Sequence, residues 1–132
     1  MRVTADTHVI IWDALKPDKL SRRAREAITA ANQSDGIIFC DISLWEIAML
    51  MEKKRIEISG DYLELIRLIK ASNHYIPHGI TPEVAELSAR LPAEINLDPA
   101  DRIIAATALI TDTRLITADQ NLRRFKIVKT IW

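Results

Sequence analysis

Short apolar segments alternate with longer segments of helical period along the whole chain. The apolar segments predict short strands over residues 2–5, 37–40, 75–76, 114–117 and 126–131. The helical periods between them predict helices over residues 21–31, 61–71, 82–90 and 99–110, and one that carries the apolar stripe Leu44, Ile47, Ala48 and Met51. Strands that alternate with helices favour an α/β fold with a parallel sheet and helical crossovers.

Size and composition narrow the class of protein further. A chain of 132 residues is expected to form one domain, residues 1–132, and 48% apolar residues with only 3 Gly and 5 Pro exclude a disordered or fibrous chain. Lys plus Arg and Asp plus Glu each total 18, so contact with nucleic acid would need a local basic patch. The single cysteine, Cys40, excludes an internal disulfide and a zinc ribbon. No signal peptide or membrane span is evident, so we expect a cytoplasmic protein without a membrane partner.

Local signals predict where several elements begin and end. Ser21, Asp61 and Thr81 are expected to be helix N-caps, because each precedes a segment of helical period. The Pro77-His78-Gly79 segment is expected to form a turn. Cys40 lies in an apolar strand and is expected to be a small buried core residue.

Four acidic residues lie at the predicted junctions between strands and helices. Asp6 follows the first strand and Asp119 follows the fourth, while Glu46 is expected in the first turn of the helix after the second strand and Asp101 in the first turn of the 99–110 helix. Each acid alone has a simpler explanation in helix capping: Ser43 to Glu46 has the spacing of a capping box, and the Asp98-Pro99-Ala100-Asp101 segment has that of a capped helix start.

Taken together, the four acids favour a shared site. The carboxyl ends of parallel strands meet at one edge of a sheet, so the fold would bring the acids close together. Two carboxylates about 5 Å apart repel by about 3 kcal/mol at an effective dielectric constant near 20. A bound cation, protonation or a basic neighbour such as Arg102 could offset this repulsion. Oxygen ligands favour Mg²⁺ or Mn²⁺, and such an ion supports hydrolysis of phosphodiesters.

The residues around these acids resemble the PIN-domain nucleases, and among them the toxins of VapBC-type toxin and antitoxin pairs. The resemblance spans nearly the whole chain. It rests on four segments in order, Asp6 to Trp12, Ile42 to Ala48, Leu97 to Arg102, and Ile116 to Asp119, and on the terminal Ile131-Trp132.

The resemblance implies a fold, an activity and a set of site residues. The fold is a single-domain three-layer α/β/α sandwich with a central, mostly parallel five-stranded sheet, and the activity is that of a metal-dependent endoribonuclease acting on structured RNA. The partners are a second copy of the chain, as a homodimer, and a cognate antitoxin. The catalytic and metal-binding residues would be Asp6, Glu46, Asp101 and Asp119, with Asp98 and Thr117 as further candidates beside a Mg²⁺ or Mn²⁺ ion.

Other residues near the predicted site have more than one interpretation. His8 lies two residues after Asp6 and could contact substrate, but we expect its side chain to point away from the acids along the next helix. The basic clusters 22–25 and 123–126 could hold phosphates, and the second is favoured because it follows Asp119, whereas residues 52–55 have the pattern of an exposed helix end. Trp12, Trp45 and Trp132 could stack on bases, although contact with a protein partner is preferred.

Two alternatives remain from the sequence alone. The first is a PIN-domain nuclease that processes RNA without being a toxin. The second is a module that binds RNA or a partner chain without catalysis, in which the acids serve only as helix caps. Loss of metal binding on replacing Asp101 separates the nuclease from the binding module.

Overall fold

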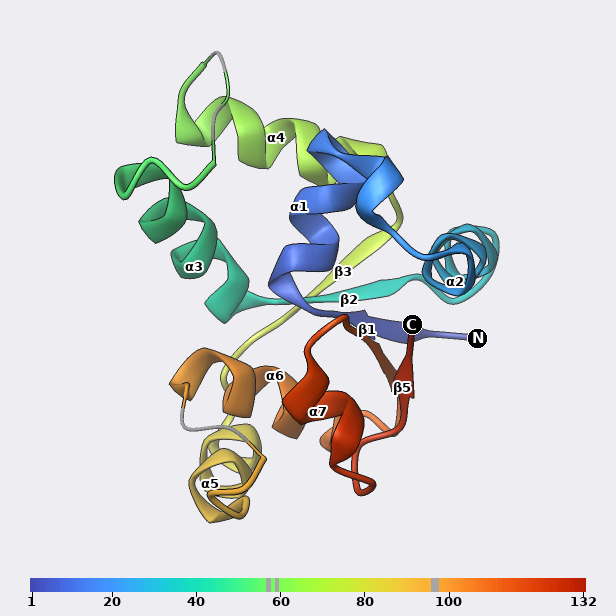
Figure 1. The fold of residues 1–132 in the computed structure, drawn as a ribbon, viewed down its shortest axis with the longest axis vertical. Helices are drawn as coiled ribbons and strands as arrows, with labels where there is room; N and C mark the ends of the chain where they lie inside the picture. Colours follow the sequence, from blue (N-terminus) through green and yellow to red (C-terminus); the bar gives the residue numbers. More distant parts are fainter. Residues whose placement is uncertain (57, 59, 96–97) are drawn as a thin grey trace.

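A five-stranded parallel sheet forms the centre of the protein in a computed structural model that describes residues 1–56, 58, 60–95 and 98–132 (Figure 1). The strand order is β3-β2-β1-β4-β5 and all four strand pairs are parallel. The strands are β1 (Val3–Ala5), β2 (Ile37–Cys40), β3 (Tyr75–His78), β4 (Arg114–Ile116) and β5 (Thr130–Ile131). From the central strand β1, the chain adds β2 and β3 toward one edge of the sheet and then β4 and β5 toward the other edge. The strand order therefore reverses between β1 and β4.

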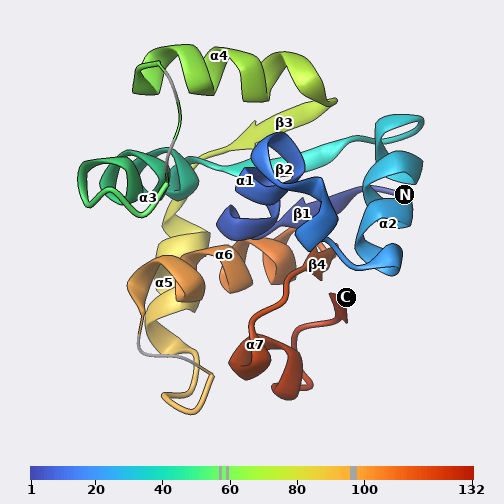
Figure 2. The ribbon, with the colours of Figure 1, turned by 45° about the horizontal axis from the view of Figure 1, so that its top comes forward.

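Helices cover both faces of this sheet (Figures 1 and 2). One layer contains α1 (Thr7–Leu15), η1 (Pro17–Lys19), α2 (Arg22–Asn32), α3 (Asp41–Glu52) and α4 (Tyr62–Ser72). The other contains α5 (Pro82–Arg90), α6 (Pro99–Ile110) and α7 (Gln120–Arg124). The prediction of a three-layer α/β/α fold with five strands is confirmed, and the sheet is parallel throughout.

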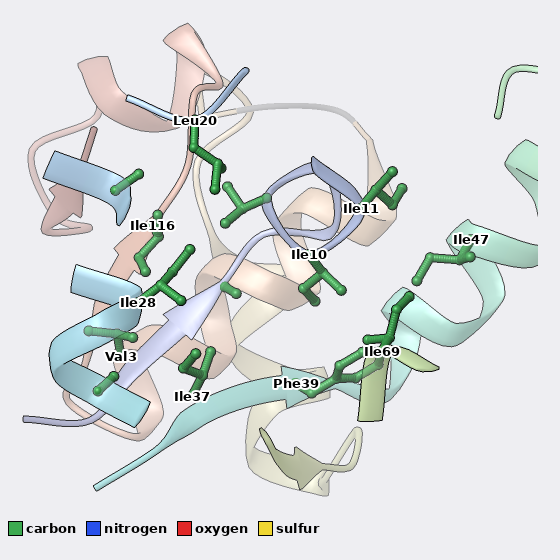
Figure 3. Close-up of a cluster of buried hydrophobic side chains, with 14 of the residues drawn as sticks. Val3, Ile10, Ile11, Leu20, Ile28, Ile37, Phe39, Ile47, Ile69 and Ile116 are labelled. Carbon is green, nitrogen blue, oxygen red and sulfur yellow. The ribbon is translucent and has the colours of Figure 1, made fainter. Parts of the chain in front are cut away.

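Alternation along the strands divides the core into two clusters. On β2, Ile37 and Phe39 face the α1 to α4 layer, whereas Ile38 and Cys40 face the α5 to α7 layer. Figure 3 shows the first cluster, in which Val3 and Ile37 of the sheet pack with Ile28 of α2. Both faces of β2 are therefore buried, as the continuous apolar run Ile37 to Cys40 predicts. Cys40 is buried, as predicted.

Two strands differ from their predicted lengths by more than one residue. The predicted turn at Pro77-His78-Gly79 is wrong, because β3 continues through Pro77, which pairs with Phe39, to His78. Proline is tolerated there because β3 is an edge strand with β2 as its one neighbour. The predicted strand 126–131 shortens to Thr130–Ile131, because Val128 turns back to donate its N–H to Phe125 and is buried in the second core cluster.

Helix starts follow the predicted caps. The side chains of Ser21, Asp61 and Thr81 each accept a hydrogen bond from the backbone N–H three residues later, at 3.1, 2.8 and 3.2 Å. The helices α2, α4 and α5 therefore begin where their sequences predict. Within the described part of the chain, every helix is too short or too polar to cross a membrane.

Candidate metal centre

A pocket of about 280 Å³ lies at the carboxyl edge of the sheet, where the strand order reverses. Its lining comprises five carboxylates and three other residues, namely Asp6, Glu46, Asp98, Asp101 and Asp119 with His8, Trp12 and Ala118. The fold thus brings together the four acids that the sequence singles out, and Asp98 with them.

Asp6 is held in place through both of its carboxylate oxygens. It follows β1 and is only 5% exposed. Its Oδ1 accepts the backbone N–H of Thr7 at 2.8 Å and caps α1, and its Oδ2 accepts the hydroxyl of Thr117 at 2.6 Å. The Thr117 hydroxyl also accepts the backbone N–H of Asp119 at 3.0 Å. Thr117 therefore links the acids that follow β1 and β4.

Glu46 is oriented from a neighbouring helix rather than by its own helix start. The capping-box interpretation of Ser43 and Glu46 is wrong, because β2 passes directly into α3 at Asp41 and Glu46 lies beyond the first turn. The carboxylate of Glu46 accepts the Thr7 hydroxyl at 2.5 Å, and that hydroxyl lies 2.8 Å from the Ser43 hydroxyl. All three side chains are buried.

The sequence pattern predicts neither the contact that Thr7 makes with Glu46 nor the contact between Ser43 and Thr7. The signals that could have identified them are weak: Thr7 directly follows Asp6, and Ser43 lies one helical turn before Glu46 on the same helix face.

Asp98 and Asp101 both lie at the start of α6. Asp98 is the N-cap, and its Oδ1 accepts the N–H of Ala100 at 2.9 Å. Carboxylate oxygens of Glu46, Asp98 and Asp101 all lie within 4.8 Å of one another, a spacing that one cation can bridge. Asp98, an uncertain candidate in the sequence, is thus central to this group.

Arg102 joins the start of α6 to the end of α5. Its guanidinium donates hydrogen bonds to the backbone carbonyls of Ser88 at 3.0 Å, Pro92 at 3.2 Å and Leu91. These contacts fix the N-terminus of α6, and with it Asp98 and Asp101. Asp119 in turn caps α7 through its Oδ1, which accepts the N–H of Leu122 at 3.0 Å.

Burial and mutual repulsion raise the pKa of three of the acids in the pocket, Asp6, Glu46 and Asp101. Burial is the largest cause for Asp6 and Glu46, and hydrogen bonds from Thr117 and Thr7 oppose the rise. The pKa of Asp101 is raised to about 8, first by burial and then by the negative charges of Asp6, Asp98, Asp119 and Glu46. A cation in the pocket would relieve this repulsion and favour the ionised carboxylates.

His8 also belongs to the pocket. Its side chain is exposed and lines the pocket beside Asp6 and Asp101. The expectation that His8 points away along the helix is therefore wrong: α1 begins at Thr7, and its first turn faces the acids.

Comparison with known proteins identifies the family. The PIN-domain profile matches residues 3–128, which is nearly the whole chain. The chain belongs to the PIN-domain family. Ribonuclease VapC22 of Mycobacterium tuberculosis (strain ATCC 25618 / H37Rv) is 36% identical to this PIN domain over 132 residues, with 98% of each chain covered.

Solved structures show the same fold. VapBC2 from Rickettsia felis, bound to a DNA fragment from its promoter, aligns with a TM-score of 0.73 at 13% identity and covers 98% of this PIN domain and 97% of its own chain. A toxin-antitoxin complex from Klebsiella pneumoniae aligns with a TM-score of 0.65 at 23% identity and covers 96% and 94%.

Proposed function

We propose that this chain is a divalent-metal-dependent endoribonuclease and the toxin of a VapBC-type toxin and antitoxin pair. The observation that carries the proposal is the convergence of five carboxylates in one pocket at the carboxyl edge of the sheet. The 36% identity to Ribonuclease VapC22 supports RNA as the substrate class. An RNA substrate and a protein antitoxin both favour the cytoplasm as the location of this protein.

The donor set fits a hard divalent cation, Mg²⁺ or Mn²⁺. The side chains within 4.8 Å of one another, Glu46, Asp98 and Asp101, offer carboxylate oxygens, which these ions prefer. Asp6 and Asp119 line the same pocket and would complete the site directly or through water. When bound, a divalent cation supplies Lewis acidity and lowers the pKa of a coordinated water.

The chain's own residues orient the acids. Thr117 holds Asp6, and Thr7 holds Glu46, so each of these two carboxylates has one oxygen fixed by a hydroxyl donor. Fixed carboxylates are pre-organised for a cation and for the phosphodiester that it would contact. Hydrolysis adds water across the P–O bond, and the leaving oxygen takes up a proton. His8, at the edge of the pocket, is placed to contact substrate.

Cleavage of RNA by the purified protein in Mn²⁺ or Mg²⁺ tests the nuclease. We expect cleavage by the wild type and none by Asp6→Asn, because asparagine can still cap α1 but loses the charge. Asp61→Asn is the matched control, since it changes an exposed N-cap of α4 in the same way and should cleave normally. Retention of RNA without cleavage by the wild type would favour the binding module.

Growth after induced expression tests the role as a toxin. We expect wild-type protein to arrest growth, Asp6→Asn to be harmless, and co-expression of the cognate antitoxin to restore growth. Cleavage in vitro without growth arrest would instead favour a PIN-domain nuclease that processes RNA.

We also propose that the protein forms a homodimer. Light scattering of the purified protein measures its molecular mass and tests this proposal.

A further inference from the structure

A second cavity, of about 600 Å³, adjoins the acidic pocket between α1 and α3. We call it the α1–α3 groove. It shares four lining residues with the acidic pocket, namely His8, Trp12, Glu46 and Asp98. The two cavities are therefore continuous, and a polymer whose scissile bond lies at the acids would extend into the groove.

The rim of the groove is basic. Lys16 and Lys19 follow α1, and Lys54 and Arg55 follow α3. Among the described residues, none of these four cations forms a salt bridge with a carboxylate. The groove therefore has acids at the end that meets the pocket and, on its rim, four cations that form no salt bridge with a described carboxylate.

The floor of the groove is apolar and includes the Trp12 ring. Ile11, Leu15, Met49 and Leu50 line it with Trp12. The Lys19 Nζ lies 5.8 Å from the centroid of the Trp12 ring, which places a cation and an aromatic surface together. An apolar floor under a basic rim suits single-stranded nucleic acid, whose bases pack on apolar or aromatic side chains while its phosphates contact lysine and arginine.

Lys54, on the rim of the groove, has a strained backbone. Helix α3 ends with the Arg55 N–H bonded to the Leu50 carbonyl at 2.9 Å, and Lys54 takes a left-handed φ of 55°. Glycine is the usual residue in that conformation because it avoids the steric cost of Cβ. A lysine here gives up stability while adding a cation to the groove.

We propose that the α1–α3 groove binds the unpaired nucleotides next to the cleaved phosphodiester, with bases on its floor and phosphates on Lys16, Lys19, Lys54 and Arg55. This inference rests on the proposed ribonuclease function. The other basic cavity, lined by Arg123 and Arg124 of α7, shares no described lining residue with the acidic pocket. The groove, rather than the 123–126 cluster that the sequence favours, is therefore the path of the RNA.

Equilibrium binding of a fluorescent single-stranded RNA of 12 nucleotides in EDTA tests the rim, since binding is then measured without cleavage. A single-strand phosphate contact contributes about 0.7 to the slope of log affinity against log salt. We expect the Lys16→Gln/Lys19→Gln variant to lower that slope by about 1.4 and to weaken binding about 25-fold at about 0.1 M salt. The Arg123→Gln/Arg124→Gln variant is the matched control and should bind nearly as the wild type does.

Substitution of Trp12 tests the floor. We expect Trp12→Leu to weaken binding at least about fivefold with an unchanged salt slope, because it removes a base contact rather than a charge. Trp12→Phe keeps an aromatic ring and should restore most of the affinity. A duplex of the same sequence should bind more weakly than the single strand, because its bases are already stacked and paired.

Lys54→Gly separates the binding role of Lys54 from a structural one. We expect this variant to have a melting temperature about 3 °C higher, because glycine relieves the left-handed strain, and yet to bind RNA about fivefold more weakly. Asp112→Gly is the matched control: Asp112 has a φ of 51° after α6, its side chain is exposed, and it lies outside the groove lining. It should gain stability without loss of RNA affinity.

The outcomes distinguish the groove from the function on which it rests. If the groove variants bind RNA as tightly as the wild type does, the proposal that the α1–α3 groove binds RNA is overturned, and the proposed ribonuclease function is unaffected. The same result, with loss of antitoxin binding in the groove variants, would assign the groove to the protein partner. Absence of both RNA binding and cleavage in the wild type would overturn the proposed function and the groove with it.

Discussion

Three of the five carboxylates in the acidic pocket each have two roles. Asp6, Asp98 and Asp119 are the N-caps of α1, α6 and α7, and they also line the pocket. Capping and a shared site are thus compatible at these positions, although the sequence presents them as alternatives. The carboxylate of Glu46 instead bonds to a hydroxyl on another helix, a contact that no local pattern predicts.

Asp101 makes the stability of the metal-free protein depend on pH. Its pKa is about 8 in the folded protein and near 3.8 when unfolded, so between these values the folded chain holds a proton that the unfolded chain has lost. Stability contributed by this group therefore falls as pH rises from about 4 to about 8. We expect Asp101→Asn in EDTA to melt about 5 °C above the wild type at pH 8, with a smaller gain at pH 5. Thermal melts at both pH values measure this, and equal gains would contradict the assignment.

Thr7 is a positioning residue for Glu46. We expect Thr7→Val to weaken Mn²⁺ binding about 10-fold to 100-fold, because the hydroxyl that fixes the carboxylate is lost. Thr7→Ser keeps the hydroxyl and should recover most of the affinity. Calorimetric titration of Mn²⁺ measures both, and equal affinities for Val and Ser would show that Thr7 acts only in packing.

At the scale of elements, helix starts were predicted best where a side chain provides the cap. Ser21, Asp61 and Thr81 mark their helices directly. The start of α3 was misassigned, because its N-cap Cys40 makes no side-chain capping bond and the helix follows β2 without a linker. The predicted last strand is too long because Val128, which is apolar, packs in the second core cluster and does not pair with a neighbouring strand.

Helix α6 holds two of the pocket acids and is stabilised by burial on both sides. We expect Ile104→Ala to cost about 2–5 kcal/mol, since Ile104 is fully buried in the second core cluster. Ile110→Ala on the same helix should cost less than about 0.5 kcal/mol, because Ile110 is 46% exposed. Urea unfolding of both variants gives the comparison, and similar costs would contradict the packing described for α6.

At the scale of the whole molecule, the sequence predicted that distant acids would meet, because a parallel sheet brings its carboxyl ends to one edge. It did not predict how the surface around them is shaped. Lys54 and Arg55 have the pattern of an ordinary exposed helix end, and only the packing of α3 beside α1 places them on a groove. Surface shape depends on how separate helices pack, and a local pattern carries little of that information.

Binding of a divalent cation should stabilise the whole protein. We expect Mn²⁺ at about 100 times its Kd to add about 2.7 kcal/mol to the free energy of unfolding. Ionised carboxylates bind the cation more tightly, so the shift in melting temperature should be larger at pH 8 than at pH 6. The Asp101→Asn variant is the control and should show a much smaller shift. A shift that is the same in both proteins would place the ion elsewhere.

The double role of the capping carboxylates bears on how a genetic selection would be interpreted. Cells that survive expression of a toxic form would include two kinds of clone at Asp6, Asp98 and Asp119. Replacement by asparagine keeps the N-cap hydrogen bond and would leave abundant but inactive protein. Replacement by alanine or valine removes the N-cap as well, which destabilises the protein and lowers its abundance. Survival alone would merge the two kinds, and an immunoblot of each clone would separate them. Asparagine clones are therefore the natural source of intact, inactive protein for isolating the antitoxin complex.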